Sequence, residues 1–240
     1  MNILIIGGAG HVGSIIRPAL EAEHDVRYFD LKPVPGAEDR TTVGDMNDQA
    51  AVARAMDGRE SVINLALGVR PGTVKDVSDI ALAFKVHVQG CYTTLCAAAW
   101  TGMKQYIYAS SMSVYDTLTG RVGVVDEMTT PDTFFNTYGM SKFMGEQICR
   151  QAGQRMPHTN IQAIRLFWPM DEAAWEKAPG GGGSPRWAAT GPKDSRRLFL
   201  AALQFREPGF HLIQATGDVT DSVYPHDMAR EKLNWEPRGE

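Results

Sequence analysis

Short apolar segments of strand length alternate with longer segments of helical periodicity along the first two thirds of the chain. We predict strands at residues 2–6, 25–30, 61–66, 105–110 and 160–167. The predicted helices between them cover residues 12–22, 48–56, 76–101 and 137–154. This alternation is typical of βαβ units, so the sequence predicts an α/β fold built on a doubly wound parallel sheet.

The regular alternation weakens after about residue 168. Residues 178–185 read Ala-Pro-Gly-Gly-Gly-Gly-Ser-Pro, a composition too flexible for regular structure. The run from Gly180 to Gly183 is either a lid that excludes water from a site or a surface excursion without function. A helix at 193–205, a short strand at 210–214 and a helical tail at 227–233 complete the pattern. We therefore divide the chain into residues 1–167 and a small C-terminal region, residues 168–240, packed on them as one compact unit.

Composition narrows the class of protein. The 240 residues are 43% hydrophobic and 22% charged, which is close to the globular average and argues against a disordered or fibrous chain. The 24 basic and 28 acidic residues give a formal net charge of −4, and no basic run offers a surface for phosphates. We therefore expect a soluble protein that does not bind nucleic acid.

The cysteines and the N-terminal segment bear on the compartment. Cys91, Cys96 and Cys149 form no CxxC pair, and an odd number suits a reducing cytosol, so we predict three buried thiols and no metal site. The opening residues lack the basic segment and cleavage site of a signal peptide, and Gly7 interrupts the apolar run far short of ~20 residues. These features predict a cytoplasmic protein without a membrane anchor.

Glycines follow the first predicted strand directly, in the sequence Gly7-Gly8-Ala9-Gly10-His11-Val12-Gly13. Gly8, Gly10 and Gly13 satisfy the GxGxxG spacing. They do so at the turn from strand to helix, which is the position where this spacing can bind a dinucleotide. Glycine allows the backbone to approach a pyrophosphate, whose charge then meets the free amides of the following helix. The pattern predicts a dinucleotide site of the Rossmann type in residues 1–167.

Asp30 ends the second predicted strand, where a carboxylate can accept hydrogen bonds from an adenosine ribose. Its charge would repel the additional phosphate of NADP, although Lys32 could attract it, so we expect NAD, with NADP less favoured. Asp45 and Met46 follow a weak third strand. They either flank the adenine or serve as a loop carboxylate beside a core methionine, and both interpretations stay open.

A second group of residues is suited to proton transfer. Tyr138 and Lys142 are spaced i, i+4, so a phenol and an ammonium share one helix face, and the cation favours the phenolate. Ser110 and Ser111 end a predicted strand at the carboxyl edge of the sheet, where ligands bind in open α/β folds. A serine there can hold a substrate oxygen while the tyrosine moves its proton.

These motifs resemble the extended short-chain dehydrogenase/reductases, also called the NAD-dependent epimerase/dehydratase family. The resemblance covers roughly residues 1–170, and the ending at residues 229–237 is also similar. The segments that carry it are Gly7–Gly13, Asp30, Asp45-Met46, Asn64-Leu65-Ala66, Ser110-Ser111-Met112-Ser113-Val114-Tyr115, Tyr138–Lys142 and Arg165.

The resemblance implies functions for individual residues. Ser111 is implied as the catalytic serine, Tyr138 as the acid/base, and Lys142 as both a ribose ligand and the activator of the tyrosine. The implied cofactor site comprises Gly7, Gly10, His11, Val12, Gly13, Asp30, Asp45, Met46, Leu65, Ala66, Tyr138 and Lys142. The implied substrate site comprises Ser111, Met112, Ser113 and Arg165. Such proteins commonly dimerise through the helices predicted at 76–101 and 137–154, so we expect a homodimer.

Several positions depart from the family pattern. His87 stands where the family usually has asparagine, and it either takes part in a buried proton or water relay or makes local structural hydrogen bonds. Tyr115 is followed by Asp116 instead of the common glycine, and Phe167-Trp168-Pro169 replaces the usual asparagine and Gly-Pro. Arg165 either binds a substrate carboxylate or forms a structural ion pair. The substrate pocket therefore cannot be copied from the family.

The leading hypothesis is an NAD-dependent oxidoreductase that acts on the hydroxyl of a sugar or sugar acid. The short C-terminal region leaves less protein to bind the nucleotide part of a nucleotide-sugar. The arrangement of the chain after Arg165 is similar to that of uronate dehydrogenases, which act on a free sugar acid. One alternative is a sugar or nucleotide-sugar epimerase, and a second is a dinucleotide-binding sensor without turnover.

Overall fold

A single seven-stranded sheet organises the protein, which we describe from a computed structural model covering residues 1–115, 124–178 and 187–240. The strand order is β3-β2-β1-β4-β5-β6-β7, and every neighbouring pair is parallel. The chain order reverses between β1 and β4, which is where ligands bind in doubly wound sheets. The predicted α/β fold with a Rossmann-type parallel sheet is confirmed.

The strands are β1 (Asn2–Ile6), β2 (Asp25–Asp30), β3 (Thr41–Val43), β4 (Ser61–Asn64), β5 (Gln105–Ser111), β6 (Asn160–Leu166) and β7 (Gly209–Ala215). The α-helices are α1 (His11–Glu23), α2 (Gln49–Met56), α3 (Val77–Phe84), α4 (Cys91–Trp100), α5 (Thr137–Arg155), α6 (Glu172–Lys177), α7 (Pro192–Gln204) and α8 (Asp227–Leu233). Short helical turns are η1 (Glu38–Arg40), η2 (Lys85–Gly90) and η3 (Met112–Val114).

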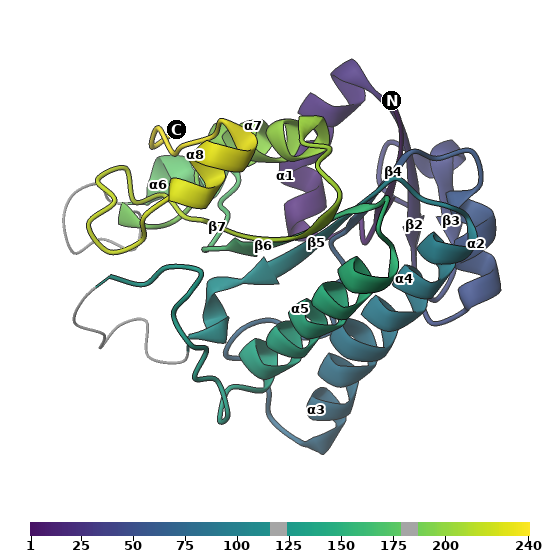
Figure 1. Ribbon diagram of the computed structural model, residues 1–240, viewed down its shortest axis with the longest axis horizontal. Helices are drawn as coiled ribbons and strands as arrows, with labels where there is room; N and C mark the ends of the chain where they lie inside the picture. The colour runs from purple at the N-terminus through teal and green to yellow at the C-terminus, as the bar shows by residue number, and fades with distance from the viewer. Residues whose placement is uncertain (116–123, 179–186) are drawn as a thin grey trace.

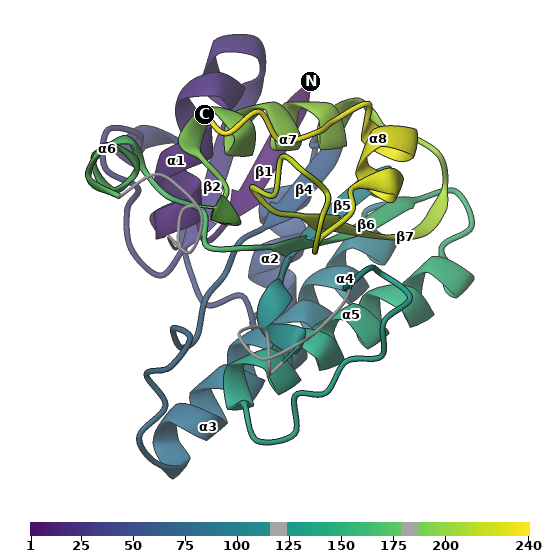
Figure 2. The same ribbon diagram turned by 90° about the vertical axis from the view of Figure 1, so that its left-hand side faces the viewer.

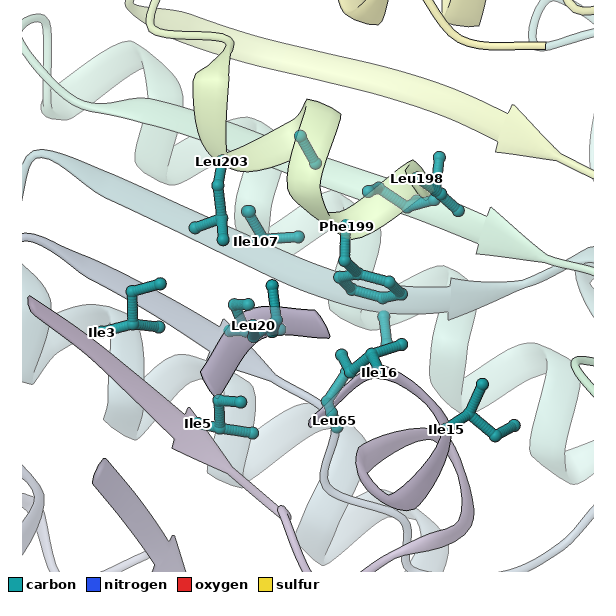
Figure 3. Packing of buried hydrophobic residues seen from close by; sticks show 14 of the residues in the cluster. Ile3, Ile5, Ile15, Ile16, Leu20, Leu65, Ile107, Leu198, Phe199 and Leu203 are labelled. Carbon is teal, nitrogen blue, oxygen red and sulfur yellow. The ribbon is translucent and has the colours of Figure 1, made fainter. Parts of the chain in front are cut away.

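Helices cover both faces of the sheet (Figure 1). On one face, α1, α7 and α8 enclose a hydrophobic cluster in which Ile5, Ile16 and Phe199 are fully buried. Figure 3 shows these side chains meeting between the strands, α1 and α7. On the other face, α2, α4 and α5 enclose a second cluster that includes Val62 and Tyr106. Because both faces are covered, the central strands β4, β5 and β6 are buried along their whole length, polar residues included.

The segment predicted as one helix over residues 76–101 is α3 and α4 joined by η2, a π-helical turn. Asp76 starts it by accepting hydrogen bonds from the amides of Ser78 and Asp79, at 2.8 and 3.3 Å. In the view of Figure 2, α3 projects beyond the rest of this layer. Asn136 starts α5 in the same way, because its side-chain oxygen accepts from the amide of Gly139 at 3.0 Å.

The C-terminal residues add to the same sheet. The predicted strand at 210–214 is β7, which pairs in parallel with β6, and α7 packs against α1. Within the described residues no helix combines the length and apolar character needed to span a membrane. The predicted loop from Gly180 to Gly183 and the departure at Asp116 both lie outside the described residues.

Candidate active site

The glycine loop turns sharply at the carboxyl end of β1. Gly7 has a φ of +82°, a conformation that side chains disfavour, and its amide donates to the carbonyl of Phe29 at 2.9 Å. A Cβ at Gly13 would lie 2.3 Å from the carbonyl oxygen of Gly8, so only glycine allows the helix to start this close to the loop. His11 and Val12 form the first turn of α1, where backbone amides face an incoming anion. This cradle fits a pyrophosphate.

Asp30 lies beside this loop at the end of β2. Its Oδ2 accepts a hydrogen bond from the amide of Ala9 at 2.9 Å, which places the carboxylate at the edge of the glycine turn. Each carboxylate oxygen can accept a further bond, so the group can still take a ribose hydroxyl. Lys32 reaches Asp30 through its backbone amide only, at 3.4 Å.

Leu65 and Ala66 lie against the glycine loop. They directly follow β4, and a Cβ at Gly7 would lie 2.7 Å from the amide nitrogen of Ala66. The ends of β1 and β4 therefore touch at the point where the strand order reverses. Asn64 holds this turn, because its Oδ1 accepts from the Ala66 amide at 3.1 Å.

The structure favours the structural alternative for Asp45 and Met46. Asp45 accepts from the amide of Asn47 at 2.9 Å and from Nζ of Lys85 at 3.2 Å. The amide of Asn47 holds the pKa of Asp45 below its usual value, and Lys85 adds to the effect. Met46 is buried in the second hydrophobic cluster, against Gly90.

Ser111 and Tyr138 meet at the carboxyl end of β5. Ser111 is the last residue of the strand, and Tyr138 follows the start of α5 by one residue. The phenol of Tyr138 lies beside the hydroxyl of Ser111, and both residues retain 7% exposure. Burial raises the pKa of Tyr138 to about 12, and the nearby hydroxyl of Ser111 offsets part of that shift. The unliganded phenol is therefore protonated at neutral pH.

Lys142 lies one helical turn after Tyr138, but its ammonium is bonded elsewhere. Nζ donates to the carbonyl of Ala109 at 2.7 Å and lies 4.9 Å from the centre of the Tyr108 ring. Burial lowers the pKa of Lys142 to about 8, although the nearby Cys91, Cys149 and Glu146 raise it. The expected lowering of the Tyr138 pKa by Lys142 is not present in this arrangement.

The two residues after Ser111, which were predicted at the substrate site, have mainly structural contacts. Met112 is fully buried in a third hydrophobic cluster with Val114, so the structure does not bring its side chain to the site. The carbonyl of Ser113 accepts from Nδ2 of Asn136 at 3.3 Å, which fastens this turn to the start of α5.

Arg165 lies in a buried network and not at an open surface. Its Nε and Nη2 donate to the two carboxylate oxygens of Glu146, and Nη1 donates to the hydroxyl of Tyr115. Ser110 donates to the same carboxylate at 2.6 Å. The structure therefore favours the ion-pair alternative for Arg165 over carboxylate binding. Sequence reasoning missed Glu146, and its spacing of one turn after Lys142 on a buried helix face was the available signal.

A loop after β6 approaches the glycine turn. His11 Nε2 donates to the carbonyl of Pro169 at 2.9 Å, which joins segments 158 residues apart. Trp168 precedes this proline with a φ of +39° and is 57% exposed. A tryptophan in that conformation is uncommon, and such residues cluster near functional sites. The aromatic ring of Trp187 stacks on Tyr224, 5.6 Å between centroids, in the same C-terminal region.

Comparisons with known proteins agree with this geometry. The sequence profile of the NAD dependent epimerase/dehydratase family matches residues 3–170. An N-acetyl-alpha-D-glucosaminyl-diphospho-ditrans,octacis-undecaprenol 4-epimerase of Escherichia coli O157:H7 is 31% identical over 156 residues, which are 65% of this chain and 45% of that protein. This chain therefore spans less than half of that relative.

Two further proteins match nearly the whole chain. The NAD-dependent glucose-6-phosphate dehydrogenase of Haloferax volcanii is 26% identical over 98% of this chain and 92% of its own length. The solved structure of glucuronic acid dehydrogenase from Chromohalobacter salexigens superposes with a TM-score of 0.78 at 24% identity, covering 99% of this chain and 84% of that one. The structural likeness extends through the C-terminal region.

Proposed function

The chain belongs to the NAD dependent epimerase/dehydratase family, and from this premise we propose that it is an oxidoreductase acting on a hydroxyl group of a sugar or sugar acid. The expected family is thereby confirmed, and NAD is the cofactor of that family. The observation that carries the proposal is the placement of Ser111 and Tyr138 side by side at the carboxyl edge of the sheet, across the switch point from the glycine loop.

The chain's own residues would hold the cofactor. The glycine loop and the first amides of α1 bind the pyrophosphate, and Asp30 accepts hydrogen bonds from the adenosine ribose. Leu65 and Ala66 lie against the glycine loop at the switch point and would contact the cofactor there. Asp45 and Met46 stabilise the loop after β3 and have a smaller part in binding. NADP is disfavoured because its extra phosphate would meet the charge of Asp30.

The proton chemistry falls to Ser111, Tyr138 and Lys142. NAD supplies the hydride acceptor when it is bound. Ser111 holds the substrate oxygen, Tyr138 accepts the hydroxyl proton as the carbon loses hydride, and the carbonyl product remains. A phenol with a pKa of about 12 needs help to lose its proton, and the ammonium of Lys142 would favour the phenolate if it left the carbonyl of Ala109 and faced the phenol.

The substrate class rests on relatives and on the small C-terminal region. Two of the matched proteins are named for glucuronic acid and for glucose-6-phosphate, which supports a compact carbohydrate substrate. Residues 168–240, including Trp168, provide the substrate-facing region in this proposal. Because Arg165 is paired with Glu146, a substrate carboxylate would need another partner. The match to a 4-epimerase supports the alternative, transient oxidation followed by hydride return to the other face.

We also propose a cytoplasmic homodimer. The outer surfaces of α4 and α5 carry exposed apolar side chains, among them Tyr92 at 61% and Trp100 at 73%. A groove on this surface is lined by Ala81, Phe84, Lys85, Val88, Gln89, Tyr92 and Ile148. A second copy placed on this surface would bury both helices in a four-helix arrangement.

The proposed activity is tested with a panel of free sugars, sugar acids and nucleotide-sugars, each incubated with NAD. Net formation of NADH indicates a dehydrogenase, whereas a new epimer without net NADH indicates an epimerase. NAD binding without turnover of any compound would favour a sensor and contradict the proposal.

A further inference from the structure

His87 occupies a buried position beside the proposed acid/base. It lies in the π-helical turn η2 and is 1% exposed. Its ring meets the ring of Tyr138 edge-on, with centroids 5.5 Å apart and planes at 82°. Single π-helical turns often occur at functional sites, because the added residue redirects a side chain.

Both nitrogens of the His87 ring are hydrogen-bonded within the protein. Nε2 accepts from the amide of Gly68 at 3.1 Å, and Nδ1 lies 2.8 Å from Oγ of Ser141. The hydroxyl of Ser141 in turn donates to the carbonyl of Tyr138 at 2.9 Å. The chain of contacts therefore runs from the loop after β4, through the imidazole, to the backbone of α5.

The two ends of this chain determine where the protons lie. A backbone amide can only donate, so Nε2 of His87 carries no proton. A backbone carbonyl can only accept, so the hydroxyl proton of Ser141 points to Tyr138. Ser141 must then receive its own hydrogen bond from the ring, which puts the proton of His87 on Nδ1. The imidazole is neutral with a single permitted tautomer.

We infer that His87 is a positioning residue that holds the loop after β4 and helix α5 at a set separation, and that it does so only as the neutral Nδ1–H tautomer. The significance of this separation for turnover rests on the proposed function. The loop carries Leu65 and Ala66 on the cofactor side, and α5 carries Tyr138 and Lys142 on the substrate side. His87 thus connects the two walls between which hydride and proton would move.

The surroundings favour the neutral ring. Burial, followed by the nearby charge of Lys142, holds the pKa of His87 well below its usual value. The titratable groups around it include Lys142 and Tyr138 on α5 and Tyr108 on β5, whose hydroxyl donates to the His87 carbonyl at 3.4 Å. No carboxylate contributes to the shift of the His87 pKa. With Nε2 already bonded, the ring has no lone pair for a substrate proton, so it is not a second base.

The tautomer is tested directly on the intact protein by ¹⁵N NMR of histidine-labelled protein. The signals of His87 are assigned by their loss in H87N. We expect one protonated nitrogen, Nδ1, and no titration of His87 across the pH range in which an exposed histidine, with a pKa of ~6.5, gains its proton. A proton on Nε2, or a charged ring at neutral pH, would overturn the inference. This result does not depend on which substrate the protein uses.

Two variants separate the two hydrogen bonds. In H87N the shorter amide can replace Nδ1 and donate to Ser141, but it cannot reach Gly68. In H87Q the longer amide can replace Nε2 and accept from Gly68, but it loses Ser141. We expect H87N to weaken NAD binding about five- to tenfold, since one hydrogen bond contributes roughly 1 kcal/mol. H87Q should leave NAD affinity within about twofold and lower kcat instead.

The variant S141A supplies the matched control. It should reproduce the kcat loss of H87Q, and the double variant H87Q/S141A should lose no more than either single variant, because both break the same connection. Equal losses of NAD affinity in H87N and H87Q would show a general packing effect and contradict the inference. If no substrate is found, the proposed function fails while the NMR and NAD-binding results still decide the role of His87.

Discussion

The guanidinium of Arg165 and the carboxylate of Glu146 form a two-point ion pair inside the protein. Nε lies 2.8 Å from Oε1, Nη2 lies 2.7 Å from Oε2, and the side chains are 2% and 1% exposed. The pair joins β6 to α5, the helix that carries Tyr138. A charged side chain that would otherwise be a candidate for substrate binding is therefore part of the support for the proposed catalytic helix.

Removing one partner of this pair should destabilise the fold. In E146Q the guanidinium stays buried without its ion-pair partner, so we expect the free energy of unfolding to fall by about 3 kcal/mol, as is typical of broken buried pairs. Urea denaturation measures the change. The control is E146L/R165M, which removes both charges and should recover a large part of the loss. A decrease below about 1 kcal/mol in E146Q would show that the pair contributes little.

Asp30 should govern both the affinity for NAD and the discrimination against NADP. We expect D30A to weaken NAD binding and to reduce the preference over NADP, because the ribose acceptor and the repulsive charge are lost together. D30N is the matched control, since its amide oxygen can still accept from Ala9 and from the ribose. It should keep more of the NAD affinity while also binding NADP better. Calorimetric titration with both dinucleotides measures this, and unchanged affinities would refute the assignment.

Tyr138 should be required for turnover and dispensable for cofactor binding. Y138F keeps the ring and its edge contact with His87 but removes the proton carrier. We expect turnover to fall by roughly 10²-fold or more, the usual scale of general acid–base catalysis, with NAD affinity nearly unchanged. Steady-state kinetics on a substrate from the panel provide the measurement. Retention of most activity would mean that another group moves the proton.

The buried ammonium of Lys142 should lower the free energy of unfolding, although turnover requires it. Its pKa of about 8 in the folded protein lies below the ~10.4 of an exposed lysine, so burying the ammonium opposes folding on the order of 3 kcal/mol below pH 8. We therefore expect K142M to raise the melting temperature of the NAD-free protein by a few degrees and to abolish most activity. A lower melting temperature in K142M would show that the hydrogen bond to Ala109 outweighs the cost of burial.

The lowered pKa of Lys142 also predicts that the free energy of unfolding depends on pH. Between pH 8 and ~10.4 the unfolded chain holds a proton on Lys142 that the folded chain has released. The lysine's contribution to the free energy of unfolding should therefore increase with pH across this range. K142M should lose this increase, so the difference between the two proteins should narrow from pH 8 upward. Denaturation at a series of pH values in this range measures that difference.

The proposed dimer should depend on the exposed side chains of α4. Light scattering at micromolar concentration should give a dimeric mass for the native sequence. W100E and Y92E place a charge on the surface proposed to be buried, and we expect both to shift the protein toward monomer without a loss of folded structure. L31E is the control, because Leu31 is equally exposed at 73% on a different part of the surface. A monomeric native protein would contradict the proposal.

Local features explain why much of the architecture was predictable. The glycine loop, Asp30 and the start of α5 each depend on a few neighbouring residues, and the structure places them near the predicted positions. The helix predicted over 76–101 was less accurate, since the π-helical turn at residues 85–90 depends on packing against α5. We predicted Met112 at the substrate site, but its side chain packs with Val114 and Tyr115 in a buried hydrophobic cluster.

The sequence by itself determined the α/β class, the family and the order of the chemical motifs, because hydrophobic periodicity and glycine spacing are properties of adjacent residues. Only the tertiary structure decided which partners the polar side chains have. Arg165 pairs with Glu146, and His87 is hydrogen-bonded to Ser141, which lies 54 residues later in the chain. The spacing of residues in the sequence could therefore not decide between the alternative roles of Arg165 or between those of His87. The physical reason is that a buried polar group must be hydrogen-bonded, and its partner is whichever group the packing of distant segments brings within about 3 Å.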